Sequence, residues 1–196
     1  MDMTNKIETE RLILRPFRAD DLDIILQLYS NRNIMRYMPN DYMDLDAAKA
    51  HLQKIEQDWQ AVPLISMEMA VLLKETRQKI GRCRIHLELE SETAMVGWLL
   101  LEKEWNKGYA TEITKALMRV SFSELHMHRV CAICNPENAA SCRVMEKCGM
   151  RKEAHYVKKC KYTKDGVSFW EDEAEYAILA SEFEERQHFN EVTGRN

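Results

Sequence analysis

The most constraining feature of the sequence is a strand end, a glycine turn and a helix start that follow one another within residues 98–112. The apolar run Trp98-Leu99-Leu100-Leu101 precedes a short polar linker, the turn Asn106-Lys107-Gly108 and a helical pattern. The first N–H groups of such a helix have no partner within it, and the helix dipole adds partial positive charge there. The stretch therefore favours an anion such as a pyrophosphate, because the glycine lets the backbone approach it closely. A plain strand-to-helix connection is the alternative interpretation.

A second informative stretch covers residues 135–150. Asn135-Pro136 breaks the chain, and a helix is predicted from Asn138, a good N-cap residue, to Cys148. Gly149 follows as a residue typical of the left-handed end of a helix. The pattern therefore predicts a short helix with a defined start and end.

Ser141 lies on the apolar face of this predicted helix. It shares that face with Val144, Met145 and Cys148, at spacings i+3, i+4 and i+7. We therefore expect its hydroxyl to point inward, either to bond back to the helix backbone or to take part in chemistry. The residues alone leave both interpretations open.

The rest of the chain alternates between strand and helix patterns, which predicts a mixed α/β fold with one sheet and the order β-α-α-β-β-β-α-β-α-β-β. Asp20 or Asp21 and then Asp44 are the expected N-caps of the first two helices, and Asp165-Gly166 is the expected turn of a final hairpin. Gly97 indicates a bulge, or a close approach by a backbone or ligand, inside its strand. The predicted strands are residues 11–15, 67–73, 83–89, 95–101, 130–134, 151–160 and 168–179, and the other helices carry apolar stripes within 22–29, 48–59 and 113–120.

Length and composition limit the classes of protein that the chain can be. A chain of 196 residues without repeats or linkers predicts one domain, 1–196, with its core at about residues 7–180 and a frayed polar tail at 186–196. A net charge of -4 gives no electrostatic footprint for nucleic acid. No apolar run is long enough for a signal peptide or a membrane span, so we expect a cytoplasmic protein without a membrane partner.

The six cysteines are expected to be reduced thiols, because disulfides are rare in the cytoplasm. His126, His128, Cys131 and Cys134 are close in sequence, and the two cysteines have the spacing C-x-x-C of many zinc sites. They fall, however, in a predicted strand, where residues three apart point to opposite faces. We therefore predict buried thiols and no metal, with zinc as the alternative.

Four segments in order resemble the GNAT superfamily of N-acetyltransferases, and within it the branch that contains the ribosomal-protein N-terminal acetyltransferases. Glu8–Arg15 resembles the E-T-x-R-L-x-L-R start of that branch, Trp105–Glu112 its W-G-K-G-Y-A-T-E turn, and Asn138–Gly149 its N-x-x-S-x-x-V-x-E-K-x-G helix. The resemblance extends over about residues 7–180, with Trp170, Asp172, Tyr176, Ala177 and Leu179 matching the last strand. Trp105 in place of the superfamily's Gln or Arg, and Asn106 in place of the branch's Gly, are its departures.

The resemblance implies a GNAT-type fold, with a mostly antiparallel mixed sheet that is splayed at the cofactor site and has helices on both faces. It also implies acetyl-CoA as cofactor. Pantetheine would lie beside the strand edge at Leu99, Leu100 and Leu101, one of whose amides would polarise the thioester carbonyl. Asn138 would bond the pantetheine arm, and Ser141 would protonate the departing thiolate as the catalytic residue. The backbone amides implied for the pyrophosphate are those of Lys107, Gly108, Tyr109, Ala110, Thr111 and Glu112.

By the same resemblance, the reaction would be direct attack of an amine on acetyl-CoA in a ternary complex. The acceptor, a protein N-terminus or a small-molecule amine, is not identified by the sequence, although residues 31–44 and 158–168 are expected to shape its site. A monomer and a homodimer are both open. The alternative is a non-catalytic acyl-CoA-binding sensor or interaction module of the same fold.

No general base is assigned from the sequence. Some relatives carry a glutamate where this chain has Cys160, and relatives often carry one where it has Met95. His155 and Asp172 remain candidates, although a satisfied histidine and a structural carboxylate that bonds a backbone amide are the alternatives.

Overall fold

A single mixed sheet organises residues 6–193, the part of the chain that this computed structural model describes. Its strand order is β1-β2-β3-β4-β5-β6-β8-β7. Every neighbouring pair is antiparallel except β5 and β6, which run parallel. The strands are β1 (Ile7–Glu8), β2 (Leu12–Pro16), β3 (Ser66–Leu73), β4 (Lys79–Glu88), β5 (Thr93–Leu100), β6 (Arg129–Cys134), β7 (Arg151–Lys164) and β8 (Val167–Leu179). The predicted mixed α/β fold with a mostly antiparallel sheet is confirmed.

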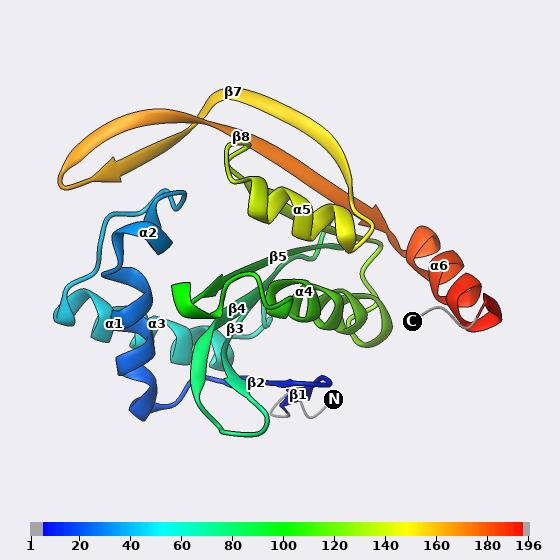
Figure 1. The fold of residues 1–196 in the computed structure, drawn as a ribbon, viewed down its shortest axis with the longest axis horizontal. Coiled ribbons are helices and arrows are strands. Elements are labelled where there is room, and N and C mark those ends of the chain that lie inside the picture. The colour runs from blue at the N-terminus through cyan, green and yellow to red at the C-terminus, as the bar shows by residue number, and fades with distance from the viewer. Residues whose placement is uncertain (1–5, 194–196) are drawn as a thin grey trace.

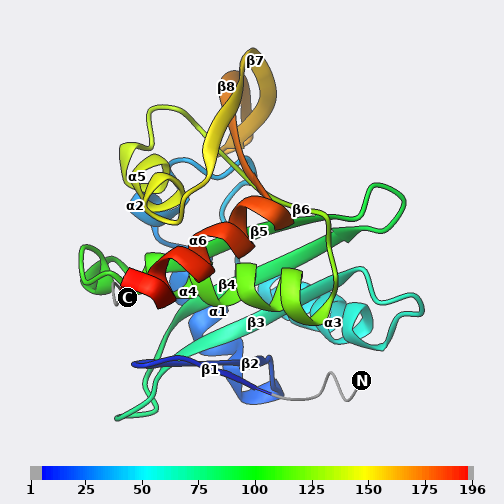
Figure 2. The same ribbon diagram turned by 90° about the vertical axis from the view of Figure 1, so that its right-hand side faces the viewer.

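Helices cover both faces of the sheet, as the views in Figures 1 and 2 show. On one face lie α1 (Leu22–Tyr29), α2 (Arg32–Met35) and α3 (Leu45–Gln60). On the other lie α4 (Tyr109–Arg119) and α5 (Ala139–Lys147), and α6 (Ala180–Thr193) follows β8. The long β7–β8 hairpin arches over α5 and reaches toward α2 (Figure 1).

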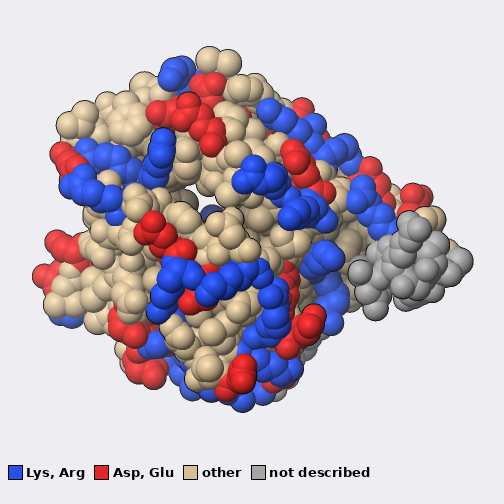
Figure 3. Space-filling view, viewed as in Figure 1, with Lys and Arg blue, Asp and Glu red and all other residues tan. Residues whose placement is uncertain are grey.

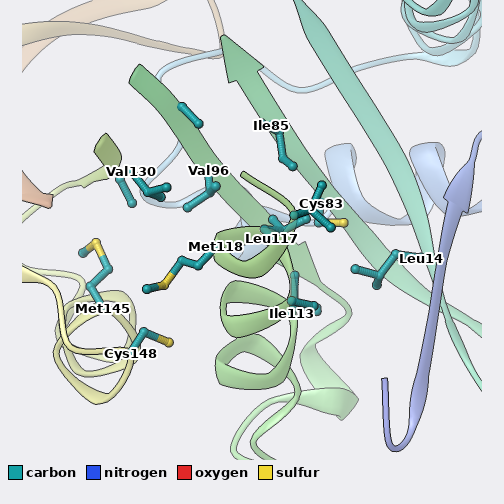
Figure 4. Packing of buried hydrophobic residues seen from close by; sticks show 14 of the residues in the cluster. Leu14, Cys83, Ile85, Val96, Ile113, Leu117, Met118, Val130, Met145 and Cys148 are labelled. Carbon is teal, nitrogen blue, oxygen red and sulfur yellow. The ribbon is translucent and has the colours of Figure 1, made fainter. Parts of the chain in front are cut away.

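Each face of the sheet has its own hydrophobic core. The larger core lies on the side of α4 and α5, where Ile113 and Leu117 of α4 point toward Cys83 and Ile85 of β4 (Figure 4). The smaller core joins α1 and α3 to Leu99 and Leu101. Because successive residues of a strand face opposite sides, Leu99 and Leu100 belong to different cores. Both faces of the strand end before the glycine turn are thereby packed against a core.

The sheet opens between its two parallel strands. β5 pairs with β6 only from Thr93↔Arg129 to Met95↔Cys131. Beyond that point β5 continues along β4 to Leu100, while β6 continues along β8 to Cys134. The two strands therefore diverge, and the expected splay is present.

Gly97 does not mark a bulge, so that part of the prediction is wrong. The register between β4 and β5 runs without a shift through Arg84↔Gly97. A Cβ atom added to Gly97 would meet no heavy atom within 4 Å. The glycine therefore borders open space beside the splay, which leaves the alternative of a ligand approaching it.

The helix starts differ in two respects from the prediction. Asp44 caps α3 as expected, since its carboxylate accepts a hydrogen bond from Ala47 N. Asp21 stands at the start of α1 without a side-chain cap bond, because its carboxylate accepts from the Arg15 guanidinium and Arg18 N instead. The short helix α2, capped by Asn31, was not predicted.

The C-terminal end is helical where we expected a frayed polar tail at residues 186–196. Helix α6 continues to Thr193, so the expectation is wrong for residues 186–193, and residues 194–196 lie outside the described part. Glu182 accepts the N–H of Leu179 at 2.8 Å and pairs with Arg151. The Phe183 ring lies 4.9 Å from that of Phe122. These contacts hold the first turn of α6 on the domain, and the helix continues from there. No helix in the described part of the chain is long and apolar enough to cross a membrane.

Candidate active site

The turn before α4 has the backbone that an anion site requires. Asn106 and Gly108 are both left-handed, with φ of 60° and 82°. Gly108 is the N-cap of α4, and the N–H of Glu112 donates to its carbonyl at 3.1 Å. The amides of Tyr109, Ala110 and Thr111 precede this first helical bond and have no partner among the described residues. Three free amides therefore open α4, whereas the Glu112 amide of the expected set is already used.

The side chain of Glu112 anchors this turn to the N-terminal segment. Its Oε1 accepts from Thr9 Oγ1 at 2.6 Å and from Arg11 N at 2.8 Å, and its Oε2 accepts from Arg11 Nε at 2.7 Å. Arg11 also donates to the Lys107 carbonyl at 2.9 Å and lies over the Tyr109 ring. Burial would raise the pKa of Glu112, but the bonds from Thr9 and Arg11 outweigh it and lower that pKa. Two motifs that are about a hundred residues apart in sequence thus form one structural unit.

The open edge of β5 lies beside this turn. Leu101 N donates to Ile80 O at 2.8 Å, so the backbone groups of Leu99 and Leu101 are directed at β4. By alternation, those of Trp98 and Leu100 are directed at the splay, and Leu100 O accepts from Trp105 Nε1 at 2.9 Å. Of the three leucines expected beside the cofactor, only Leu100 presents its N–H to the open side.

The start of α5 lies at the other side of the splay. Asn138 Oδ1 accepts from Ser141 N at 3.2 Å, which confirms Asn138 as the N-cap. The Sγ atoms of Cys142 and Cys134 are 3.6 Å apart, so the first turn of α5 lies against the end of β6. The half-buried Ser141 hydroxyl makes no hydrogen bond within residues 6–193, so the back-bonding interpretation is not realised.

The two segments expected to shape an acceptor site meet in the structure. Tyr162 OH donates to Tyr37 O at 3.0 Å, and Thr163 N donates to Pro39 O at 3.0 Å. Figure 3 shows an opening near the centre of this face of the molecule; acidic and uncharged residues lie just below it, and a band of basic side chains lies further down. Acidic and basic side chains otherwise alternate over the surface in this view.

The two candidate bases form an exposed pair on the β7–β8 hairpin. His155 Nε2 and Asp172 Oδ2 are 2.8 Å apart, and Asp172 Oδ1 accepts from Lys158 N at 2.9 Å. The bond from Lys158 N, followed by that from His155, lowers the pKa of Asp172. Asp172 therefore holds a backbone bulge at Lys158, where φ is 50°. The structural interpretation of both residues is the one that the contacts support.

A different carboxylate, Glu173, was missed in the sequence. Glu173 is 5% exposed, and its Oε2 accepts from Cys160 Sγ at 3.0 Å. Burial, followed by the bond to Glu173, raises the pKa of Cys160 to about 11. The available signal was the alternation of Glu171, Glu173 and Glu175 along β8, which puts three carboxylates on one face.

The histidines and cysteines near β6 do not gather into a metal site. Cys131 lies opposite Ala177 and Cys134 opposite Ala174, so the two thiols face different sides of the sheet. Burial raises the pKa of Cys131 to about 11. Among the residues that the structure describes, no group of three histidine, cysteine or acidic side chains is placed to hold a metal ion.

Comparisons with known proteins agree on one family. The model of the acetyltransferase (GNAT) domain matches residues 11–151. The N-acetyltransferase YnaD of Bacillus subtilis is 34% identical over 177 residues, which cover 90% of this chain and 98% of YnaD.

Solved structures share the fold. The spermidine N-acetyltransferase of Vibrio cholerae, in complex with CoA and spermine, has a TM-score of 0.77 at 22% identity, over 89% of this chain and 99% of that one. A ribosomal L7/L12 alpha-N-protein acetyltransferase in complex with CoA has a TM-score of 0.76 at 17% identity, over 89% and 98%.

Proposed function

The chain belongs to the GNAT family of N-acetyltransferases, and on that premise we propose that it transfers the acetyl group of acetyl-CoA to a primary amine by direct attack in a ternary complex. The observation that carries the proposal is the arrangement around the splay between β5 and β6. Free helix-start amides lie on the β5 side, and the unbonded hydroxyl of Ser141 lies near the end of β6.

The free amides of Tyr109, Ala110 and Thr111 fit the diphosphate of CoA. They add a positive end of a helix dipole to three aligned donors, which suits a doubly charged anion. At Gly108, φ of 82° would strain any other residue, and an added Cβ would lie 3.3 Å from Arg11 Nη2. Glu112 contributes by fixing the turn through its side chain, and Lys107 through its carbonyl bond to Arg11.

The groups that line the splay suit a thioester. In the proposed complex the N–H of Leu100 points at the carbonyl oxygen and stabilises the negative charge that amine attack builds there. Asn138 lies at the α5 start within reach of the pantetheine arm. The Ser141 hydroxyl gives its proton to the departing thiolate, which needs only mild acid assistance because a thiol has a pKa of ~8.5.

The acceptor is proposed to be a polyamine or the N-terminal amine of a protein. Relatives of the same fold are named for both classes, spermidine in one and ribosomal L7/L12 in another. We also propose that the protein acts in the cytoplasm.

Two measurements test this function. Calorimetric titration should give CoA binding, and acetyl-CoA with spermidine or with a peptide carrying a free N-terminal serine should release CoA thiol. Ser141→Ala should lower kcat by about 10²-fold while leaving the Kd of CoA unchanged. Binding of CoA without thiol release from any amine would favour the sensor alternative, and absence of binding would refute the phosphate-turn assignment.

A further inference from the structure

Glu173 is a buried carboxylate on β8 of the β7–β8 hairpin. It is 5% exposed, whereas its cross-strand neighbour Tyr156 is 38% exposed. Tyr176 of β8 bonds Glu146 of α5, so its side chain lies on the α5 side of the sheet. Glu173 is three residues away on the same strand and therefore faces the other side, which α1 and α2 cover. Burying an ionised carboxylate costs free energy unless it is paired, and both partners that the structure gives Glu173 come from the neighbouring strand β7.

A bulge in β7 arranges two side chains around this carboxylate. Between Tyr156↔Glu173 and Cys160↔Glu171 the register shifts, so that β7 carries extra residues there. The shift lets Lys159 Nζ approach Glu173 Oε1 at 2.6 Å while Cys160 Sγ reaches Oε2 at 3.0 Å. The side chain of Lys159 is 49% exposed, so this ammonium can leave into solvent.

Lys159 also shows what the carboxylate accepts. Its Nζ is a primary alkylammonium in direct contact with Glu173, which is the functional group of the proposed acceptor. An incoming amine that takes the place of Lys159 finds a buried oxygen at hydrogen-bond distance. Glu173 therefore already pairs with a primary ammonium, the functional group that the proposed acceptor carries.

Glu173 lies beside the mouth of the splay. β6 ends at Cys134, opposite Ala174, so Glu173 stands one residue past that end on β8. Cys134 contacts Cys142, the neighbour of Ser141, on the α5 side. The pKa of Cys134 is raised by burial first and by Cys142 second. The charge of Glu173 adds a smaller contribution, so Glu173 lies close enough to the end of β6 to affect it electrostatically. Ser141 and Glu173 thus lie on opposite faces of the sheet near one strand end.

Tyr162 of β7 connects the neighbourhood of Glu173 to a segment that was expected to shape the acceptor site. The Tyr162 phenol, whose pKa is raised to about 12 mainly by burial and also by Cys160, Glu171 and Glu173, bonds the α2–α3 segment at Tyr37. The titratable groups around Glu173 are therefore Lys159, Cys160 and Tyr162 on β7, Glu171 on β8 and Cys134 on β6.

We propose that Glu173 is the group that takes the proton from the acceptor ammonium, an inference that rests on the proposed acetyl transfer. The ammonium gives one proton to the carboxylate, which passes it to solvent. The nitrogen then forms its bond to the carbonyl carbon, and the carbon–sulfur bond breaks. The second proton of the nitrogen replaces the one that Ser141 gives to the thiolate, so the products are the amide, CoA thiol and one released proton.

The test compares Glu173→Gln with Glu171→Gln, which removes the same charge from the same face of the same strand. With acetyl-CoA and whichever of spermidine or the serine peptide turns over best, Glu173→Gln should lower kcat at pH 7 by about 10²-fold or more. The deficit should shrink as the pH approaches the pKa of the amine, because the free amine then needs no base. Glu171→Gln should stay within about threefold of wild type, and both variants should keep the wild-type Kd for CoA.

The outcomes separate the two proposals. If the wild type turns over and Glu173→Gln has the same kcat, or if Glu171→Gln loses as much kcat as Glu173→Gln, the assignment of the base is overturned and acetyl transfer still stands. A wild type that binds CoA but acetylates neither amine overturns both. If Glu173→Gln does not fold, Glu173→Asp keeps the charge against Lys159 but withdraws the carboxylate, and it should show the same pH-dependent loss of kcat.

Discussion

Replacing Glu112 with alanine should loosen the turn that opens α4 without touching its backbone amides. The carboxylate accepts hydrogen bonds from Thr9 Oγ1, Arg11 N and Arg11 Nε. The Glu112 side chain is only 15% exposed, so the bonds from Thr9 Oγ1 and Arg11 N are shielded from water. Each of these bonds to a charged group contributes about 1.5 kcal/mol. Arg11 is 43% exposed, so its guanidinium regains water and its ion pair adds well under 1 kcal/mol. We expect Glu112→Ala to lower the free energy of unfolding by about 3 kcal/mol.

The same loss sets an upper bound on the effect on cofactor binding. If all of the roughly 3 kcal/mol of turn stabilisation had to be regained on binding, the Kd for CoA would rise about 140-fold, since 1.4 kcal/mol corresponds to a factor of ten. Glu112→Gln keeps an acceptor oxygen for Thr9 and Arg11 N, but it removes the charge and places an NH2 donor where Oε2 accepted from Arg11 Nε. The Arg11 side chain is 43% exposed, so its guanidinium regains water. Glu112→Gln should therefore cost about 1 kcal/mol or less.

Urea unfolding and calorimetric titration with CoA measure the two effects, with Lys115→Ala on the exposed side of α4 as the matched control. Because the pKa of Glu112 is lowered in the fold, its contribution is present above the unfolded pKa of about 4.3 and is lost as the pH falls through the folded value. The gap between wild type and Glu112→Ala should therefore begin to narrow as the pH falls below about 4.3, and it should close only below the lowered pKa of the folded protein. An unfolding free energy of Glu112→Ala within about 0.5 kcal/mol of wild type at pH 7 would refute the anchoring role.

Two further perturbations follow from the structure. Gly108→Val should raise the Kd for CoA about tenfold or more in calorimetry, because a β-branched residue at φ of 82° costs about 1–3 kcal/mol of strain at the turn; binding at wild-type affinity would contradict this. Asp21→Asn should lower the free energy of unfolding by about 3–5 kcal/mol at pH 7, because it leaves the Arg15 guanidinium unpaired against a fully buried side chain. Burial would raise the pKa of Asp21, but Arg15 and Arg18 N outweigh it and lower that pKa. The difference in unfolding free energy between wild type and Asp21→Asn should therefore persist above the unfolded pKa of about 3.9 and vanish as the pH falls through the lower pKa of the folded protein. A difference that is unchanged at low pH would exclude the ion pair as its cause.

Local patterns were sufficient for the elements that flank the splay. Asn138 starts the helix α5 through a side-chain hydrogen bond, and Gly149 follows its last turn with a left-handed backbone. Both effects act within a few residues. Gly108 does the same for the start of α4. Such signals need no knowledge of the rest of the fold, so the sequence predicts them well.

Contacts between distant segments could not be predicted in the same way. Glu112 was assigned by its backbone amide, yet its side chain binds Thr9 and Arg11 from the other end of the chain. Asp21 looked like a helix cap, but the Arg15 guanidinium competes for its buried carboxylate. Glu173 depends on a bulge in the neighbouring strand, and a bulge changes the register without changing the hydrophobic pattern.

The break at Asn135-Pro136 explains how one strand end can serve two chemical roles. β6 stops at Cys134, which frees the chain to start α5 over one face and so places Ser141 there. β8 does not stop with it, and its next residue past the last β6 pair is Glu173, on the opposite face. A proposed proton donor and a proposed proton acceptor are thereby separated by the thickness of one sheet at the point where it opens. Their positions relative to the splay follow from the length of β6, because each added residue of β6 would carry α5 further along β8.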